Sequence, residues 1–341
     1  QRTNFCTMGA ISDAVFMGDW NRFRSWMLAI AIAILGSQAL HVGGVLDLRG
    51  SIYLTPNLGW AGAIVGGTLF GFGMTMTGGC GNKTLVRLGA GNLKSLIVVI
   101  FIGIFAYMTL RGLTGLARVE LEEILNINLE ARGINDQGLP TFLGVLGISD
   151  LTARLTSIAV ITLGLFWFVF KSAEFRASKA NLAGGIIIGL LIPVAWYVTG
   201  VIGFDDFEPT PLASFSFVAP VGESIQYLMT FTGSTINFGI AVVAGVIAGS
   251  FLAAKSSGEF KIEAFTDSND MVRHIIGASI MGFGGVLALG CTVGQGITGI
   301  STLAVGSFLA LFSIFLGGYY GLKYMEEGTL SGALAAVFGR D

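Results

Sequence analysis

Long runs of uncharged, mostly hydrophobic residues alternate with short charged stretches along the whole chain. A charge at the centre of a bilayer is costly, so an uncharged run of about 20 residues predicts a helix that spans a membrane. The predicted spans lie at 26–46, 58–78, 95–110, 155–170, 180–204, 224–254 and 274–322. The last run is long enough for two spans with a further segment between them.

Two of these runs are short, about 24 Å each at 1.5 Å per residue. Lys94 and Arg111 flank the run 95–110, and Arg154 and Lys171 flank 155–170. Long basic side chains can extend from a helix end to the membrane surface, so we expect both runs to span with their flanking cations at the interfaces.

Three stretches fit no span. Residues 112–135 have mixed charge and leucines near helical spacing, which predicts an amphipathic helix on the outer surface. Residues 207–222 contain three prolines and predict an external loop or interfacial segment. Residues 256–272 are polar and predict a cytoplasmic loop.

The composition supports a membrane protein and excludes an ordinary water-soluble domain. Hydrophobic residues make up 53% of the 341 residues and charged residues only 12%, against about 25% charged in soluble domains. Mean hydropathy is +0.77. The 51 glycines allow helices to approach closely in a membrane. We therefore expect an all-α polytopic membrane protein with about 8–9 transmembrane helices.

The charge and cysteine content narrow the chemistry. A net charge of −2 gives no reason to expect a nucleic-acid partner, and two histidines are too few for a histidine-built metal site. We expect no metal and no cofactor. Three cysteines cannot all pair, so we expect free thiols rather than a disulfide framework. The chain begins at Gln1, and we expect a preceding segment that carries a signal or a first helix.

The basic residues predict the orientation. With alternating spans, 14 of the 19 Lys and Arg residues fall in one set of loops. The other set carries only Arg49, Arg111, Arg118, Arg132 and Arg154, and it is rich in acids. By the positive-inside rule, the N-terminal segment is expected to face the cytoplasm of a multi-pass protein in the cell inner membrane.

An internal repeat organises the chain. Residues 70–80 read FGFGMTMTGGC and residues 281–291 read MGFGGVLALGC, with five identities at an offset of 211. Five predicted spans separate the copies, so they should cross the membrane in opposite directions. We expect two inverted-topology repeats, at about 1–112 and 180–324, joined by an outer amphipathic segment at about 112–150.

The two repeats end on Cys80 and Cys291, and each cysteine precedes a segment too short to span, at 81–92 and 292–303. A helix that breaks at the cysteine and returns as a re-entrant half-helix would expose free N–H groups and a positive dipole end, which suit an anion. Lys83 and Arg87 would lie at the cytoplasmic mouth of this site.

Thiols suit an anion that contains sulfur, because a soft S–H donor matches a large, polarisable and weakly hydrated atom. We predict a substrate path along Cys6, Cys80 and Cys291. A lone cysteine in a membrane helix is more often a small packing residue, and matched repeat positions favour function only for Cys80 and Cys291. Weaker candidates for substrate contact are Gly79, Gly290, Thr77, Asn82, Thr292 and Gln295.

These segments resemble the YeeE/YedE family of sulfur-transport membrane proteins. The resemblance rests on residues 2–10, 71–80, 236–262 and 282–296 and covers essentially the whole chain. It implies thiosulfate passage along three cysteines at the waist of an hourglass-shaped protein, at positions that match Cys6, Cys80 and Cys291. It also implies a cytoplasmic TusA-like sulfur-carrier partner. Residues 81–92 differ from those of the family's thiosulfate carriers, which leaves the substrate open.

The function expected is import of thiosulfate or a related sulfur anion, and not an enzyme. Each negative charge that enters against the membrane potential costs about 2.3 kcal/mol per 100 mV, so we expect cytoplasmic consumption of the sulfur to drive uptake. One alternative is a membrane-embedded sulfurtransferase that carries a cysteine persulfide. Another is a channel or carrier for sulfide or selenium compounds.

Overall fold

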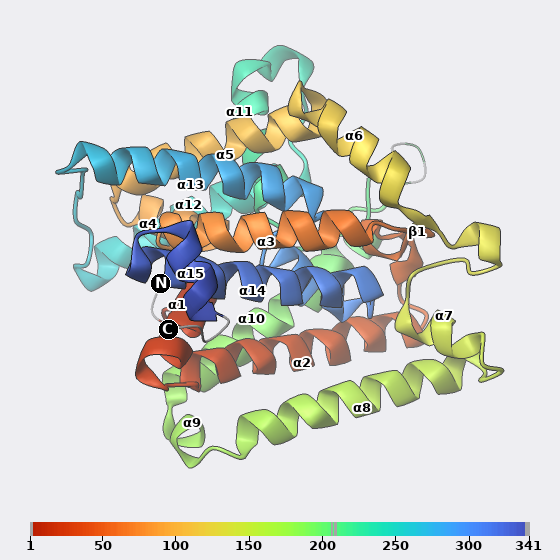
Figure 1. Cartoon of the computed structure of the whole chain (residues 1–341). Helices are drawn as coiled ribbons and strands as arrows, with labels where there is room; N and C mark the ends of the chain where they lie inside the picture. The colour runs from red at the N-terminus through yellow and green to blue at the C-terminus, as the bar shows by residue number, and fades with distance from the viewer. Residues whose placement is uncertain (1–2, 206, 208–209, 338–341) are drawn as a thin grey trace.

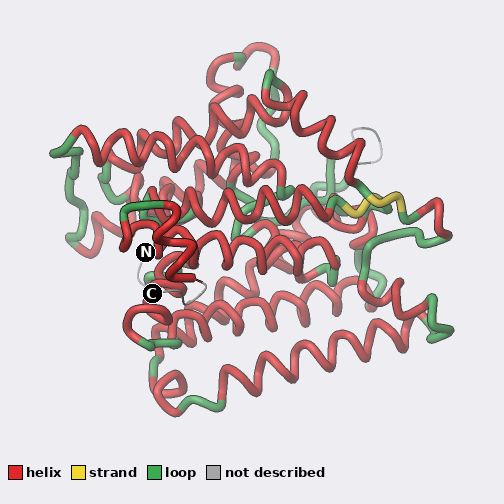
Figure 2. The backbone as a smooth tube through the Cα atoms, viewed as in Figure 1, coloured by secondary structure: helices red, strands yellow, loops and turns green. Residues whose placement is uncertain are grey.

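The protein is a bundle of helices, most of which run roughly along one common direction (Figure 1). The computed structural model describes residues 3–205, 207 and 210–337, so Arg2 of the N-terminal motif lies outside the described residues. Both chain ends lie at the same end of the bundle. Figure 2 shows one small stretch of strand among the helices. The all-α fold expected from the sequence is confirmed.

Seven described helices are long and apolar enough to cross a membrane. They are α2 (Asn21–Val42), α3 continued by α4 (Trp60–Gly89), α5 (Leu93–Arg111), α8 (Asp150–Phe170), α10 continued by η5 (Lys179–Ile202), α12 (Phe238–Ser257) and α14 (Val305–Glu327). A further 20-residue helix, α13 (Ser268–Leu287), packs against α3. The chain is a multi-pass membrane protein.

Short elements connect the long helices. Before α3 these are α1 (Thr7–Ser12), η1 (Asp13–Met17), η2 (Leu48–Gly50) and η3 (Ile52–Leu54). Strands β1 (Asn57–Leu58) and β2 (Ile127–Asn128) pair antiparallel. The others are α6 (Thr114–Leu125), η4 (Glu130–Arg132), α7 (Leu139–Gly144), α9 (Ala173–Ala177), α11 (Val218–Met229), η6 (Phe231–Gly233), η7 (Gly294–Gly299) and α15 (Leu330–Val337).

Two sequence expectations need correction. The predicted span 224–254 is interrupted: α11 ends at Met229 and α12 begins at Phe238. The polar stretch between them ends in Asn237, whose side chain accepts a hydrogen bond from the N–H of Ile240 and so starts a new helix. The amphipathic helix predicted at 112–135 is also shorter, because α6 ends at Leu125 and strand β2 follows.

Glycines let the central helices touch backbone to backbone. Helix α3 packs against both α13 and α14. A Cβ atom on Gly66 would lie 2.6 Å from the carbonyl oxygen of Gly284 in α13, and one on Gly67 would lie 2.9 Å from that of Ala310 in α14. Larger residues would push these helices apart, so part of the glycine excess is explained by this packing.

Candidate anion site at two helix breaks

The first break follows α3. That helix ends at Met76, Gly78 adopts a left-handed conformation with φ +68°, and Cys80 is extended before α4 (Gly81–Gly89) begins. Arg87 of α4 reaches back, and its Nη1 atom donates a hydrogen bond to the carbonyl oxygen of Gly78 at 2.9 Å. The Thr77 hydroxyl donates to the carbonyl oxygen of Gly79 at 3.0 Å. Local contacts therefore hold the broken backbone in shape.

The second break follows α13. Leu289 adopts a left-handed conformation with φ +58°, two residues before Cys291. After Cys291 the chain returns through η7, a six-residue π-helical turn. The half-helix expected from the sequence at this position is this short π-helical turn. The glycines of the η7 sequence GQGITG disfavour a regular α-helix. Gln295 ties the turn back to α13, because its Nε2 atom donates to the carbonyl oxygen of Ala288 at 2.6 Å.

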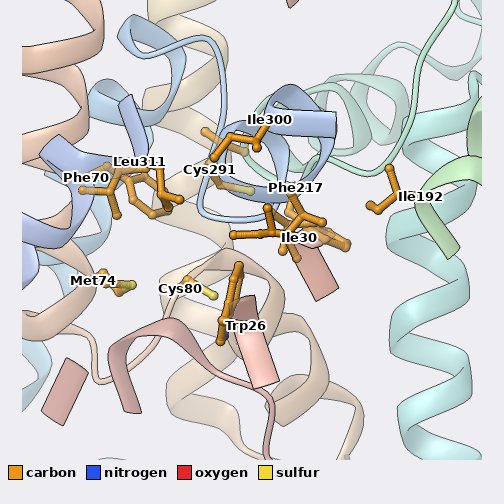
Figure 3. Packing of buried hydrophobic residues seen from close by; sticks show 14 of the residues in the cluster. Trp26, Ile30, Phe70, Met74, Cys80, Ile192, Phe217, Cys291, Ile300 and Leu311 are labelled. Atoms are coloured by element: carbon orange, nitrogen blue, oxygen red, sulfur yellow. The ribbon is translucent and has the colours of Figure 1, made fainter. Parts of the chain in front are cut away.

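All three cysteines are free and buried, with exposures of 5% for Cys6, 2% for Cys80 and 1% for Cys291. Cys80 and Cys291 belong to one hydrophobic core cluster, part of which Figure 3 shows. The segment of Cys6 lies against that of Cys80, because Lys83 of α4 donates a hydrogen bond to Asn4 at 3.1 Å and Phe5, the neighbour of Cys6, packs against the cluster that contains Cys80. The structure thus gathers three thiols from segments more than 70 residues apart in the sequence.

The thiols differ in their hydrogen bonds. The Sγ atom of Cys6 accepts a hydrogen bond from the N–H of Gly9 at 3.5 Å, and that of Cys291 accepts one from the N–H of Gly294 at 3.3 Å. Cys80 precedes α4 as its N-cap, but its side chain makes no such bond. The Cys80 thiol lies at the positive end of α4.

Several polar side-chain atoms around these breaks are buried and have no hydrogen-bond partner among the described residues. They are Thr7 Oγ1, Trp26 Nε1, Thr292 Oγ1 and Gln295 Oε1. Thr292 directly follows Cys291. Most buried polar groups in proteins are paired, so these atoms are available to hold a polar ligand. Sequence reasoning singled out Thr292 and Gln295 and missed Thr7 and Trp26.

The remaining candidates lie beside the breaks. Asn82 is half-buried in the first turn of α4. A Cβ atom on Gly79 would lie 3.3 Å from Lys83 Cγ, and one on Gly290 would lie 3.1 Å from the backbone nitrogen of Gln295. Both glycines therefore leave room for the returning segment to fold back against the break.

Cations gather on the side of the cysteines nearest the chain ends. The Nζ atom of Lys83 donates to Asn4 Oδ1 at 3.1 Å, and Arg87 lies one turn further along α4. Arg22 joins them: it forms an ion pair with Asp13 at 3.0 Å, and its guanidinium lies over Gly9, the hydrogen-bond partner of Cys6. Nothing in the spacing of Arg22 signals this position, which depends on how α1 packs on α2.

A buried polar chain supports the second break from the opposite side. Arg154 of α8 is only 5% exposed, so the expectation that it extends to the membrane surface is wrong. Its Nη1 atom donates to Gln38 Oε1 at 3.0 Å, and Gln38 Nε2 donates to the carbonyl oxygen of Ser301 at 2.8 Å. Trp196 Nε1 donates to the Ser301 hydroxyl at 3.3 Å. These hydrogen bonds anchor Ser301, which lies just after η7.

A cavity of about 960 Å³ lies among the loops at the end of the bundle opposite the two termini. Arg49, Asp136 and Asp150 line it, and Arg49 forms ion pairs with both acids. None of the three cysteines lines this cavity. Within the described ranges, no three His, Cys, Asp or Glu side chains come together as a metal site requires.

Comparison with known proteins agrees with this architecture. Two relatives are each named "Thiosulfate transporter TsuA". The one from Escherichia coli (strain K12) is 26% identical over 339 residues, covering 93% of this chain and 88% of the relative. The one from Spirochaeta thermophila is 26% identical over 323 residues, covering 94% of this chain and 92% of the relative. The model of the family described as "Sulphur transport" matches residues 2–320. The chain therefore belongs to the sulphur transport family, as its resemblance to the YeeE/YedE proteins implied.

Proposed function

We propose that this protein imports thiosulfate, or a closely related sulfur anion, through a path lined by Cys6, Cys80 and Cys291. The observation that carries the proposal is the set of three buried free thiols, two at the helix breaks and one at the start of α1. The named thiosulfate transporters among the relatives, aligned over nearly the whole chain, support the choice of substrate.

The proposed site binds an anion without a buried cation. Backbone N–H groups at the breaks and the N-terminus of α4 supply positive partial charge. The thiols supply soft donors for a terminal sulfur atom. Thr77, Gly79, Asn82, Gly290, Thr292 and Gln295 are proposed to shape or contact the path. Cys80, at the N-terminus of α4, is proposed as the central contact.

We propose that the two breaks belong to inverted repeats. The offset of 211 carries α1 onto α11, α2 onto α12, α3 onto α13, α4 onto η7 and α5 onto α14, with ends that differ by six residues or fewer. The packing partners correspond as well: α3 packs on α14 as α13 packs on α5. The equivalence covers about 6–111 and 217–322, within the repeats proposed from the sequence. Cys6 then corresponds to Phe217, a buried residue in the same cluster (Figure 3).

Transport is proposed to run inward across the cell inner membrane, with the N-terminal segment in the cytoplasm. Arg22, Lys83 and Arg87 would then draw the anion from the cysteines toward the cytoplasm. Because a dianion enters against the membrane potential, we propose that a TusA-like carrier consumes the sulfur and keeps its cytoplasmic concentration low.

We propose that the chain is a transporter rather than a sulfurtransferase. A persulfide-forming cysteine needs a stabilised thiolate. Cys80 is buried in a hydrophobic cluster, and such surroundings oppose the charged thiolate. Trapping a persulfide on Cys80 by mass spectrometry during turnover would contradict this part of the proposal.

The test is uptake of radiolabelled thiosulfate by proteoliposomes that contain the purified protein. We expect uptake by the wild-type protein, a loss of at least tenfold in Cys80→Ala, and little change in Gly249→Ala, a helix position with no atom within 4 Å of an added Cβ. Uptake of labelled selenite or sulfide in place of thiosulfate would indicate one of the alternative substrates. Full uptake by Cys80→Ala would overturn the thiol path.

A further inference from the structure

Trp26 is a buried tryptophan with an unused hydrogen-bond donor. It lies in the second turn of α2, is 1% exposed, and its Nε1 atom has no hydrogen-bond partner among the described residues. Trp196, the other tryptophan of the core, donates its N–H to the Ser301 hydroxyl. A buried indole N–H usually has a partner, so Trp26 is the exception that needs an explanation.

Its position places this donor at the cysteines. The indole ring stacks on Phe5, the neighbour of Cys6, with ring centroids 4.5 Å apart and planes at 24°. Figure 3 shows the same ring near Cys80, and both side chains belong to one buried cluster. Trp26 therefore lies in the part of the core that holds Cys80, and it packs against the residue next to Cys6.

We propose that the Trp26 indole N–H is a substrate-binding donor that takes an oxygen atom of the sulfur anion. The inference rests on the proposed function and adds to it. The buried Thr292 hydroxyl, next to Cys291 in the sequence, is a second donor of the same kind. The site would then bind both ends of one anion. The thiols would contact its soft terminal sulfur, and the N–H and O–H donors would contact its oxygens.

This arrangement predicts selectivity. An anion with both a terminal sulfur and S–O oxygens uses both sets of donors, whereas hydrosulfide has no oxygens and sulfate has no soft sulfur. Loss of the indole N–H removes a hydrogen bond to a charged group, which corresponds to at least about a tenfold loss of affinity. Because the bond is to substrate, the loss should appear in the KM for thiosulfate.

The experiment replaces the N–H without changing the shape of the side chain. Trp26 is exchanged for 3-benzothienylalanine, in which sulfur stands in place of the indole N–H, by site-specific incorporation into the full chain. The same analogue at Trp167, which is 69% exposed on α8, is the matched control. Thiosulfate uptake kinetics are measured in proteoliposomes. We expect the KM to rise at least tenfold for position 26 and to stay within twofold of wild type for position 167.

Trp26→Phe serves as a second variant, with the same expected direction for the KM. A KM within twofold of wild type for the benzothienyl protein at position 26 overturns the inference, as does a fall in Vmax alone, because packing loss without substrate contact would give that result. Cys80→Ala is measured in parallel. Full uptake by that variant would contradict the thiol path, and the KM of the Trp26 variants would still decide the Trp26 inference. If the wild-type protein takes up no thiosulfate, both the proposed function and the Trp26 inference are contradicted.

Discussion

Gly73 of α3 and Gly277 of α13 face each other so closely that a Cβ atom on Gly73 would lie 2.5 Å from the carbonyl oxygen of Gly277. A second contact joins Gly66 and Gly284 of the same helices. At the offset of 211, Gly66 corresponds to Gly277 and Gly73 to Gly284, so each contact maps onto the other. Two helices related by a twofold axis touch in this way. The contact supports the proposal of inverted repeats.

This crossing should tolerate no larger residue. Gly73→Leu is expected to destabilise the protein by at least about 1–3 kcal/mol, because the side chain would overlap the backbone of α13. Gly249→Leu, at a position in α12 with open space around it, should have little effect. Thermal unfolding of both variants in the same detergent measures the difference. Equal unfolding temperatures for the two variants would show that the close contact does not exist.

Replacing Cys291 by serine or by alanine should distinguish its effect on stability from its effect on transport. The Cys291 sulfur accepts a hydrogen bond from the N–H of Gly294, and a serine oxygen can accept the same bond. Cys291→Ala is therefore expected to lose about 0.5–2 kcal/mol of stability, whereas Cys291→Ser should keep it. Both should lose thiosulfate uptake by at least tenfold, since neither has a thiol. Normal uptake by a well-folded Cys291→Ser protein would contradict the role of the thiol.

Arg154 should matter for stability although it lies far from the cysteines in the sequence. Arg154→Met leaves the buried Oε1 atom of Gln38 without its donor, which costs about 1–3 kcal/mol. Arg111→Met, at an exposed helix end, removes a cation without such a partner and is the control. Thermal unfolding of the two variants is compared in detergent. A control that loses as much stability as Arg154→Met would show that charge alone is responsible.

The proposed orientation can be read from single added cysteines, because the three native cysteines are buried and should react slowly. Glu120 is exposed on α6 and Ser256 is exposed near the end of α12. A membrane-impermeant maleimide should label Glu120→Cys in intact cells, and Ser256→Cys only after the cells are permeabilised. The reverse pattern would place the N-terminal segment outside the cytoplasm.

Much of the architecture could be predicted from the sequence, because the position of a membrane span depends on the residues within that span alone. A membrane excludes charge residue by residue, so the uncharged runs at 26–46, 58–78 and 95–110 coincide closely with α2, α3 and α5. The break at 230–237 was missed because it contains no charge. Helix α11 ends at Met229 and Asn237 caps α12, and a scan for charged residues does not detect these signals.

The sequence by itself determined the membrane class, the positions of most spans and the two repeated segments that end on Cys80 and Cys291. These features depend on the residue types within one segment and on the solvent around it. Only the tertiary structure decided which distant side chains join those cysteines. Trp26 and Arg22 take their places through the packing of α1 and α2 around the breaks, and Arg154 turns inward because Gln38 offers a buried acceptor. Such contacts depend on how helices cross, and close approach over glycine sets those crossings in three dimensions.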